Sequence, residues 1–123
     1  MVNYCFVNPI LSGKTDLVKK FSNENGTNNQ EHNEFFEIIG ISREQVWIQQ
    51  APTNNNEGIP DTCIVSWETD DPLKTFKDFA MSDHPWAIKF WEFAKEAFGI
   101  DIKKVTSPPP INDLVVDWYK ENN

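Results

Sequence analysis

Four short segments of the chain carry apolar residues on both faces of the strand that each would form. They are residues 3–9, 44–50, 62–68 and 111–119. Their length and their content of β-branched and aromatic residues are typical of strands. Side chains of a strand point alternately to opposite faces, so a sheet with one solvated face has polar residues at every second position. In the first segment, however, Tyr4 and Phe6 share one face while Cys5 and Val7 share the other. Both faces of the predicted sheet therefore require burial.

Helical patterns lie between these strands. Residues 12–21 have an apolar edge, and Thr15 or Ser12 is expected to provide the N-cap. Residues 70–81 and 85–98 each begin with a proline in the first turn and carry apolar residues at helical spacing. These segments are expected to be helices.

The polar stretch 22–34 contains no apolar residue and is expected to be solvated. Thr27 and Gln30 have the spacing of a capping box, which predicts a second helix that stops at Gly40. The turn signal at Gly26 indicates either a bend in one helix or a break between two, and the sequence leaves both open.

The resulting order is β-α-β-β-α-β, an α+β arrangement of the ferredoxin-like kind. Such motifs form a four-stranded antiparallel sheet with the helices on one face. The chain has the size of one domain, which we expect to span residues 1–123. Because helices cover one face only, a second copy of the same sheet is the expected cover for the other. The sequence thus predicts a homodimer that joins the open sheet faces, a dimeric α+β barrel.

The charge of the chain weighs against nucleic acid and membrane as partners. The 19 acidic residues outnumber the 11 Lys and Arg, the net charge is −8, and the basic residues form no run. Nucleic acids and anionic membranes both require a basic field. No apolar run has the length of a membrane span, and the first residues lack the pattern of a signal peptide, so a cytoplasmic location is expected. Cys5 and Cys63 have no Cys-x-x-Cys motif, so we expect buried free thiols rather than zinc or redox chemistry.

The stretch SDHPWAIKFWEFAKEAFG, residues 82–99, is dense in aromatic residues. Nine residues between 86 and 98 are apolar, which is more than a helix packed on one surface needs. Two interpretations stay open. The aromatic residues either form solid core, covered by the proline-rich linker and a partner subunit, or line a pocket between helix and sheet. Trp86, Phe90 and Trp91 are the candidates for a pocket wall.

His84 and Gln49 are the polar candidates for such a pocket. Because His84 precedes Pro85, it is expected just before a helix, where the helix dipole favours anions and keeps an imidazole neutral. It is therefore a candidate anion ligand or base, or alternatively a residue that caps the helix locally. Gln49 lies in a strand that is otherwise apolar on both faces, and a buried amide needs partners. It either orients a ligand or forms structural hydrogen bonds.

Four stretches resemble successive blocks of a family of small, functionally uncharacterised bacterial proteins. They are GISREQVWIQQAP, VSWETDDP, SDHPWAIKFWEFAKEAFGIDI and PPPINDLVVDW. That family has the dimeric α+β barrel fold of the antibiotic-biosynthesis monooxygenases. The resemblance covers residues 35–118 and implies the fold, but the family has no settled activity to transfer. The chain departs from the family pattern at Ala87, where relatives carry an acidic residue, and at Phe98, where they often carry a histidine.

The haem-degrading enzymes of the same superfold give a second comparison. Trp67 falls where the resemblance places their tryptophan. No histidine stands near Lys89 or Phe90, where their axial ligand would lie, so neither haem nor another cofactor is expected. The carboxylates of residues 68–72 are expected to start a helix rather than to bind a metal.

We therefore expect a protein that binds a small apolar or anionic molecule, aromatic ligands included, between its helices and sheet, without catalysis. The candidate binding residues are Trp67, His84, Trp86, Phe90, Trp91 and Gln49. The alternative is a cofactor-independent enzyme of monooxygenase or isomerase type, which would use the same pocket with His84 as its base.

Overall fold

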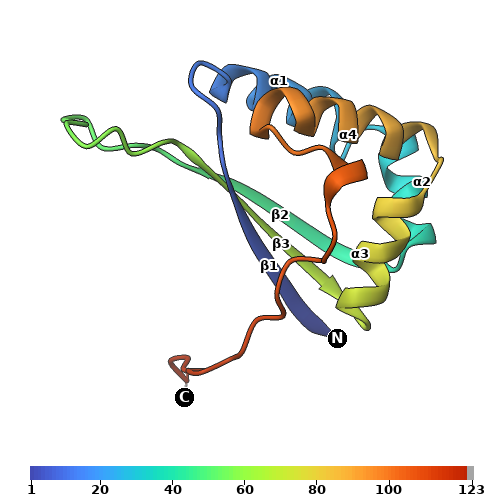
Figure 1. Ribbon diagram of the computed structural model, residues 1–123. Helices are drawn as coiled ribbons and strands as arrows, with labels where there is room; N and C mark the ends of the chain where they lie inside the picture. The colour runs from blue at the N-terminus through green and yellow to red at the C-terminus, as the bar shows by residue number, and fades with distance from the viewer. Residues whose placement is uncertain (122–123) are drawn as a thin grey trace.

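A three-stranded antiparallel sheet carries four α-helices on one face in this computed structural model, which describes residues 1–121 (Figure 1). The strands are β1 (Val2–Pro9), β2 (Ile41–Gln49) and β3 (Thr62–Thr69). The helices are α1 (Thr15–Asn25), α2 (Gln30–Ile38), α3 (Pro72–Met81) and α4 (Pro85–Phe98), followed by the short 3-10 helix η1 (Ile102–Lys104). The expected α+β class is thus confirmed.

The strand order is β1-β3-β2, so β3 is central and both of its edges are paired. Tyr4 lies opposite Trp67 in the β1–β3 pair, and Glu44 lies opposite the same tryptophan in the β2–β3 pair. These three side chains point to the helix-covered face, because neighbours across strands share a face. Trp67 is therefore at the centre of the buried side of the sheet.

The expected four-stranded sheet, and with it the ferredoxin-like β-α-β-β-α-β order, is wrong, because residues 111–119 form no strand. The proline-rich linker takes the position beside β1 instead. The Asn112 side chain bonds to both backbone groups of Cys5, accepting from its N–H at 2.6 Å and donating to its C=O at 2.9 Å. This side-chain amide stands in for a strand backbone at one residue of the β1 edge. The three prolines before it lack the N–H groups that a ladder needs.

The polar stretch between α1 and α2 separates two helices and is not a bend within one helix. α1 ends at Asn25, and α2 begins after Asn29, whose Oδ1 accepts a hydrogen bond from the His32 N–H at 3.1 Å. A Cβ at Gly26 would lie 2.5 Å from the Ser22 carbonyl oxygen, so the tight exit from α1 requires glycine.

The N-caps expected for α1 and α2 are wrong. Lys14 precedes α1 and makes no side-chain cap, while the Thr15 hydroxyl donates to Asp61 at 2.6 Å and joins the helix to the segment before β3. Asn29, and not Thr27, is the N-cap of α2. The expected solvation of this stretch is wrong at His32, which is buried.

α3 and α4 start and stop where the sequence signals lie. Asp71 caps α3 by accepting from the Lys74 N–H at 3.2 Å, and prolines occupy the first turns of both helices. Gly99 ends α4 with a φ of 71°, a left-handed conformation that glycine adopts at little cost. The helices predicted for residues 70–81 and 85–98 are confirmed.

Seven of the fifteen buried hydrophobic residues in the described chain are aromatic. Tyr4, Phe35 and Phe79 are almost fully buried, and Phe79 stacks on Trp67 with ring centroids 5.5 Å apart. Phe21 of α1 stacks on Phe93 of α4 at 4.0 Å. Such rings bury large areas and dominate packing energetics. The aromatic residues of α4 are therefore held on several sides by neighbouring elements.

The open face of the sheet is less apolar than the sequence pattern suggested. A row across the three strands consists of Val7, Ile64 and Trp47, of which Val7 is 61% and Trp47 47% exposed. The next row contains Ser66 and Gln45 with Cys5, so polar groups flank the apolar row. In residues 1–121, no helix combines the length and apolarity that crossing a bilayer requires.

Candidate functional site

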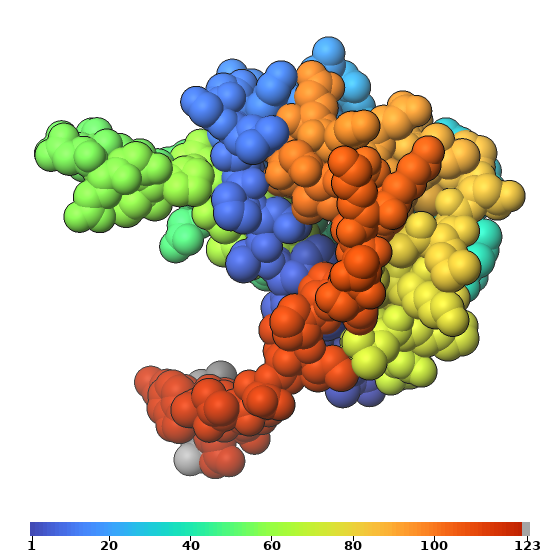
Figure 2. Space-filling model, viewed as in Figure 1, coloured from blue at the N-terminus to red at the C-terminus, as the bar shows by residue number. Residues whose placement is uncertain are grey.

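A groove of about 610 Å³ lies between β1, the helices α3 and α4, and the chain segment after α4. We call it the α3–α4 groove. Phe6 and Trp67 form its floor on the sheet, and Phe76 and Trp91 stand on the helices. The segment 105–112 closes the outer side, where Figure 2 shows it passing between β1 and α3.

Two clasps hold this outer wall against β1. The Tyr4 hydroxyl donates a hydrogen bond to the Pro109 carbonyl oxygen, and burial raises the pKa of Tyr4. The Asn112 amide pairs with the Cys5 backbone three residues later. Because Pro108 to Pro110 restrict the backbone between the clasps, the wall is a stiff strap rather than a free loop.

The side chains that line the groove carry no charge. Within the described part of the chain, the lining has aromatic, aliphatic and proline residues, and its polar members are Cys5, Asn8, Ser107 and Asn112. Asn112 is committed to the backbone of Cys5. The Cys5 thiol donates to Ser66 at 3.4 Å, on the open face of the sheet. This leaves Asn8 and Ser107 as the side chains that can orient a polar substituent of a ligand.

The indole N–H groups near the groove are already used. Trp91 donates to the Phe79 carbonyl oxygen at 3.3 Å, and Trp67 donates to Glu44 Oε2 at 2.8 Å. Because a buried donor is costly to leave unpaired, these indoles offer a ligand their ring faces rather than their N–H groups. The groove is therefore an apolar, aromatic surface.

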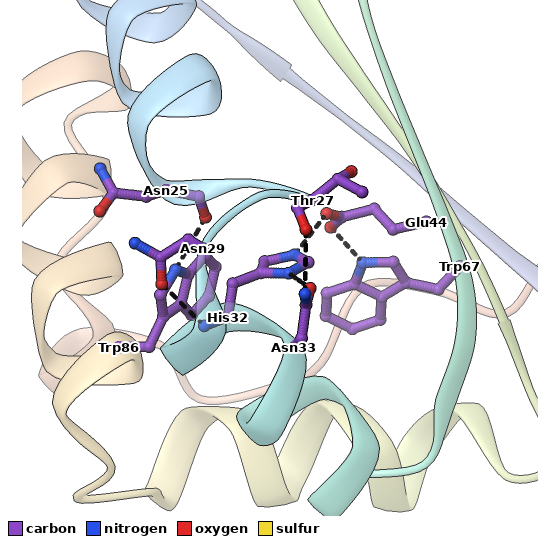
Figure 3. A network of polar contacts seen from close by, with 8 residues as sticks. All are labelled: Asn25, Thr27, Asn29, His32, Asn33, Glu44, Trp67 and Trp86. Carbon is purple, nitrogen blue, oxygen red and sulfur yellow. Dashed lines mark hydrogen bonds and ion pairs between the residues drawn. The ribbon is translucent and has the colours of Figure 1, made fainter.

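A smaller cavity of about 210 Å³, here the inner cavity, lies on the other side of Trp67. It contains the titratable groups that the groove lacks, His32 from α2 and Glu44 from β2 (Figure 3). His32 Nε2 lies 3.3 Å from Glu44 Oε1, while the other Glu44 oxygen accepts from Trp67. Glu44 thus connects α2 to the centre of the sheet.

The hydrogen bonds around His32 favour its protonated form. The Asn33 amide nitrogen donates to the Thr27 carbonyl oxygen at 2.9 Å, which leaves Asn33 Oδ1 facing His32 Nδ1 at 2.8 Å (Figure 3). Both ring nitrogens therefore face acceptors, Asn33 Oδ1 and Glu44 Oε1, and both can donate only when the ring is protonated. This arrangement is that of an imidazolium paired with a carboxylate.

The direction of the pKa shift agrees with this assignment. Burial by itself lowers the pKa of His32, but the hydrogen bonds to Glu44 and Asn33 and the charge of Glu44 outweigh it, so the pKa lies above its ordinary value. The ring of His32 also packs on Phe36, with centroids 4.0 Å apart. The ion pair of His32 with Glu44 therefore joins α2 to β2 and has a structural role.

The structure brings together four of the six residues singled out from the sequence. Trp67 and Phe90 form the wall shared by the groove and the inner cavity, Trp91 lines the groove, and Trp86 lines the inner cavity. The Trp86 indole donates to the Asn25 carbonyl oxygen at 2.9 Å. The aromatic stripe of α4 is therefore partly core and partly cavity wall.

The two polar candidates lie elsewhere. His84 Nδ1 accepts from the Trp86 N–H at 3.1 Å, and the ring stacks on Phe35, so His84 caps α4 and lines neither cavity. Gln49 is exposed at the end of β2 and lies opposite Thr62. Neither residue faces the groove.

Sequence reasoning missed His32, Glu44 and the strap. His32 was masked by the polar stretch in which it lies. A signal for Glu44 did exist, because it shares a strand face with Val46 and Ile48 and is the one carboxylate on that side of the segment 44–50. The strap could not be found from its sequence, since its position depends on contacts with Tyr4 and Cys5 more than 100 residues away.

Burial raises the pKa of the Cys63 thiol to about 11, so this cysteine stays protonated and unreactive at neutral pH. Among residues 1–121, no three His, Cys, Asp or Glu side chains gather into a metal-binding group.

Comparison with protein-family models, curated proteins and solved structures gives no match to the chain. A proposal for the function therefore depends on the geometry of the groove and the inner cavity.

Proposed function

We propose that this protein binds a small, uncharged, apolar or aromatic molecule in the α3–α4 groove, in the cytoplasm and without catalysis. The observation that carries the proposal is a groove of about 610 Å³ whose lining, in residues 1–121, has no charged side chain. Pockets for small molecules typically enclose about 300–1,000 Å³ and are mainly apolar, with a few polar groups. The groove meets both conditions.

The aromatic lining favours a flat ligand. Phe76 and Trp91 meet edge to face at the helix side, with ring centroids 6.3 Å apart, and Phe90 lies beside Trp91. A planar ring placed against these faces gains both apolar burial and ring–ring contact. Asn8 and Ser107, at the groove surface, are placed to bond to one polar substituent.

The absence of charge from the described lining favours an uncharged ligand over an anionic one. A carboxylate in this groove would lose hydration and would meet no cation. The same lining gives no support to an enzyme with His84 as base, because His84 caps α4 outside the groove. The two free cysteines, Cys5 and Cys63, fit the reducing cytoplasm.

The test is binding of Nile red, a neutral planar dye whose emission rises in apolar surroundings. In Val105→Trp, a large ring is added at the rim of the groove and should lower Nile red affinity at least about tenfold by occupying the site. The matched control is Ile88→Trp, which enlarges an exposed apolar side chain of α4 outside the groove. Equal binding by both variants, or no binding by the wild type, would overturn the proposal.

A further inference from the structure

The C-terminal arm, residues 113–119, exposes an unusual amount of apolar surface. Five of its side chains are 71–88% exposed: Leu114, Val115, Val116, Trp118 and Tyr119. Single exposed apolar residues are common on protein surfaces, but a contiguous group of this size marks an interaction site. In Figure 2 the segment stands clear of the rest of the molecule.

The arm has one fully apolar side when extended. Alternation places Leu114, Val116 and Trp118 together on that side, and it places Asp113 and Asp117 on the other side with Val115 and Tyr119. This pattern is typical of a segment that lies on an apolar surface and keeps its carboxylates in water.

The root of the arm is fixed. Asn112, the residue directly before it, pairs with the Cys5 backbone, and the strap before Asn112 is stiff. Figure 1 shows the chain leaving the β1 edge and running away from the helices and the sheet. The arm is therefore held in a position from which it reaches a neighbouring molecule.

A matching surface exists on the open face of the sheet. Val7, Ile64 and Trp47 form an apolar row across β1, β3 and β2. At a strand spacing of about 4.8 Å this row spans roughly 10 Å, and the apolar side of the arm spans roughly 13 Å. The row and the arm are comparable in length, and both lack a cover in the described chain.

We propose that the arm of each chain docks on the open sheet face of a second copy, which forms a symmetric homodimer. Each copy supplies one arm and one face, so the contact closes on itself and leaves no further arm exposed. This proposal does not depend on the ligand of the groove.

The available area is sufficient for a stable dimer. Aromatic side chains bury roughly 150–250 Å² each, so the largely exposed Trp118 of two arms contributes roughly 300–500 Å². Leu114 and Val116 of both arms add roughly 60–120 Å² each, and the sheet surface beneath the arms is buried to about the same extent. The total reaches the roughly 1,200 Å² at which specific interfaces begin.

The test is the molar mass of the intact chain, measured by light scattering and sedimentation across micromolar concentrations. We expect twice the chain mass of 14.2 kDa. Trp118→Asp should raise the dimer dissociation constant about a hundredfold, because the symmetric interface loses two aromatic contacts of about tenfold each. Trp47→Glu, on the receiving face, should have an effect of the same order.

The matched control is Ile38→Lys, which replaces a similarly exposed apolar residue at the end of α2 and should leave the dimer intact. Circular dichroism of each variant confirms folding. A monomeric wild type would overturn the proposal, as would a dimer that persists in Trp118→Asp. A dimer that loses stability in Trp118→Asp but not in Trp47→Glu would also overturn it, because the arms would then bind each other rather than the sheet.

Discussion

The α3–α4 groove and the inner cavity share a wall of aromatic side chains but differ in charge. Phe6, Trp67, Phe79 and Phe90 line both spaces. On one side of this wall the described lining is uncharged, and on the other side His32 and Glu44 form a largely buried ion pair. The difference indicates that the charges of the interior hold the fold together, while the larger uncharged space is free to accept a ligand.

Removal of the Glu44 carboxylate should have the largest effect on stability. Glu44→Ala leaves the imidazolium of His32 and the indole N–H of Trp67 without their acceptor. Breaking a buried ion pair from one side costs about 3 kcal/mol in the free energy of unfolding, which urea denaturation measures. Glu57→Ala, at an exposed position between β2 and β3, should change it by less than about 0.5 kcal/mol. Equal free energies of unfolding for the two variants would show that the His32–Glu44 pair does not stabilise the fold.

Loss of the His84 cap should have a smaller effect. His84→Ala removes the acceptor for the Trp86 N–H and should lower the free energy of unfolding by about 1 kcal/mol. His84→Asn should retain most of it, because asparagine is a good N-cap. Both variants should bind Nile red as the wild type does. A loss of Nile red affinity in His84→Asn would indicate that His84 contacts the ligand.

The pH dependence of stability should show the smallest effect, since burial opposes the groups that raise the pKa of His32. A raised pKa in the folded state means that protonated His32 stabilises the fold below the ordinary histidine pKa of about 6.5. This contribution to the free energy of unfolding is lost as the pH rises through the raised pKa of His32. The stability difference between wild type and His32→Gln should therefore be larger at acidic pH than at alkaline pH. A difference that grows toward alkaline pH would contradict the assignment of an imidazolium.

The parts of the fold that the sequence predicted correctly depend on local patterns. The three strands of the sheet and the helices α3 and α4 follow from alternation, helical spacing and the prolines at helix starts. The segment 111–119 has an equally good strand pattern, yet it forms no strand, because pairing depends on whether a distant edge is free. At the β1 edge this segment bonds to the backbone of Cys5 through the Asn112 side chain and not through a strand backbone.

Prediction of the candidate site was limited in the same way, because local patterns do not specify contacts between distant segments. Phe90 and Trp91 could be selected from their density and spacing, and Trp67 from its position in the resemblance to the haem-degrading enzymes. The structure places all three in the groove wall. His84 was selected for its chemistry, but its place at a helix start also made it the natural cap, and the cap is what the structure shows. The pairing of His32 with Glu44 joins a polar stretch to a strand, and no local pattern specifies such a contact.

The central claim is that the groove selects an uncharged ligand, and calorimetric titration with 2-naphthol and 2-naphthoate tests it most directly. The two molecules share a flat ring system and differ in charge at neutral pH. Because the lining supplied by the described residues has no cation to replace the lost hydration of a carboxylate, 2-naphthol should bind at least about tenfold more tightly. Equal or tighter binding of 2-naphthoate, or no binding of either molecule, would contradict the account.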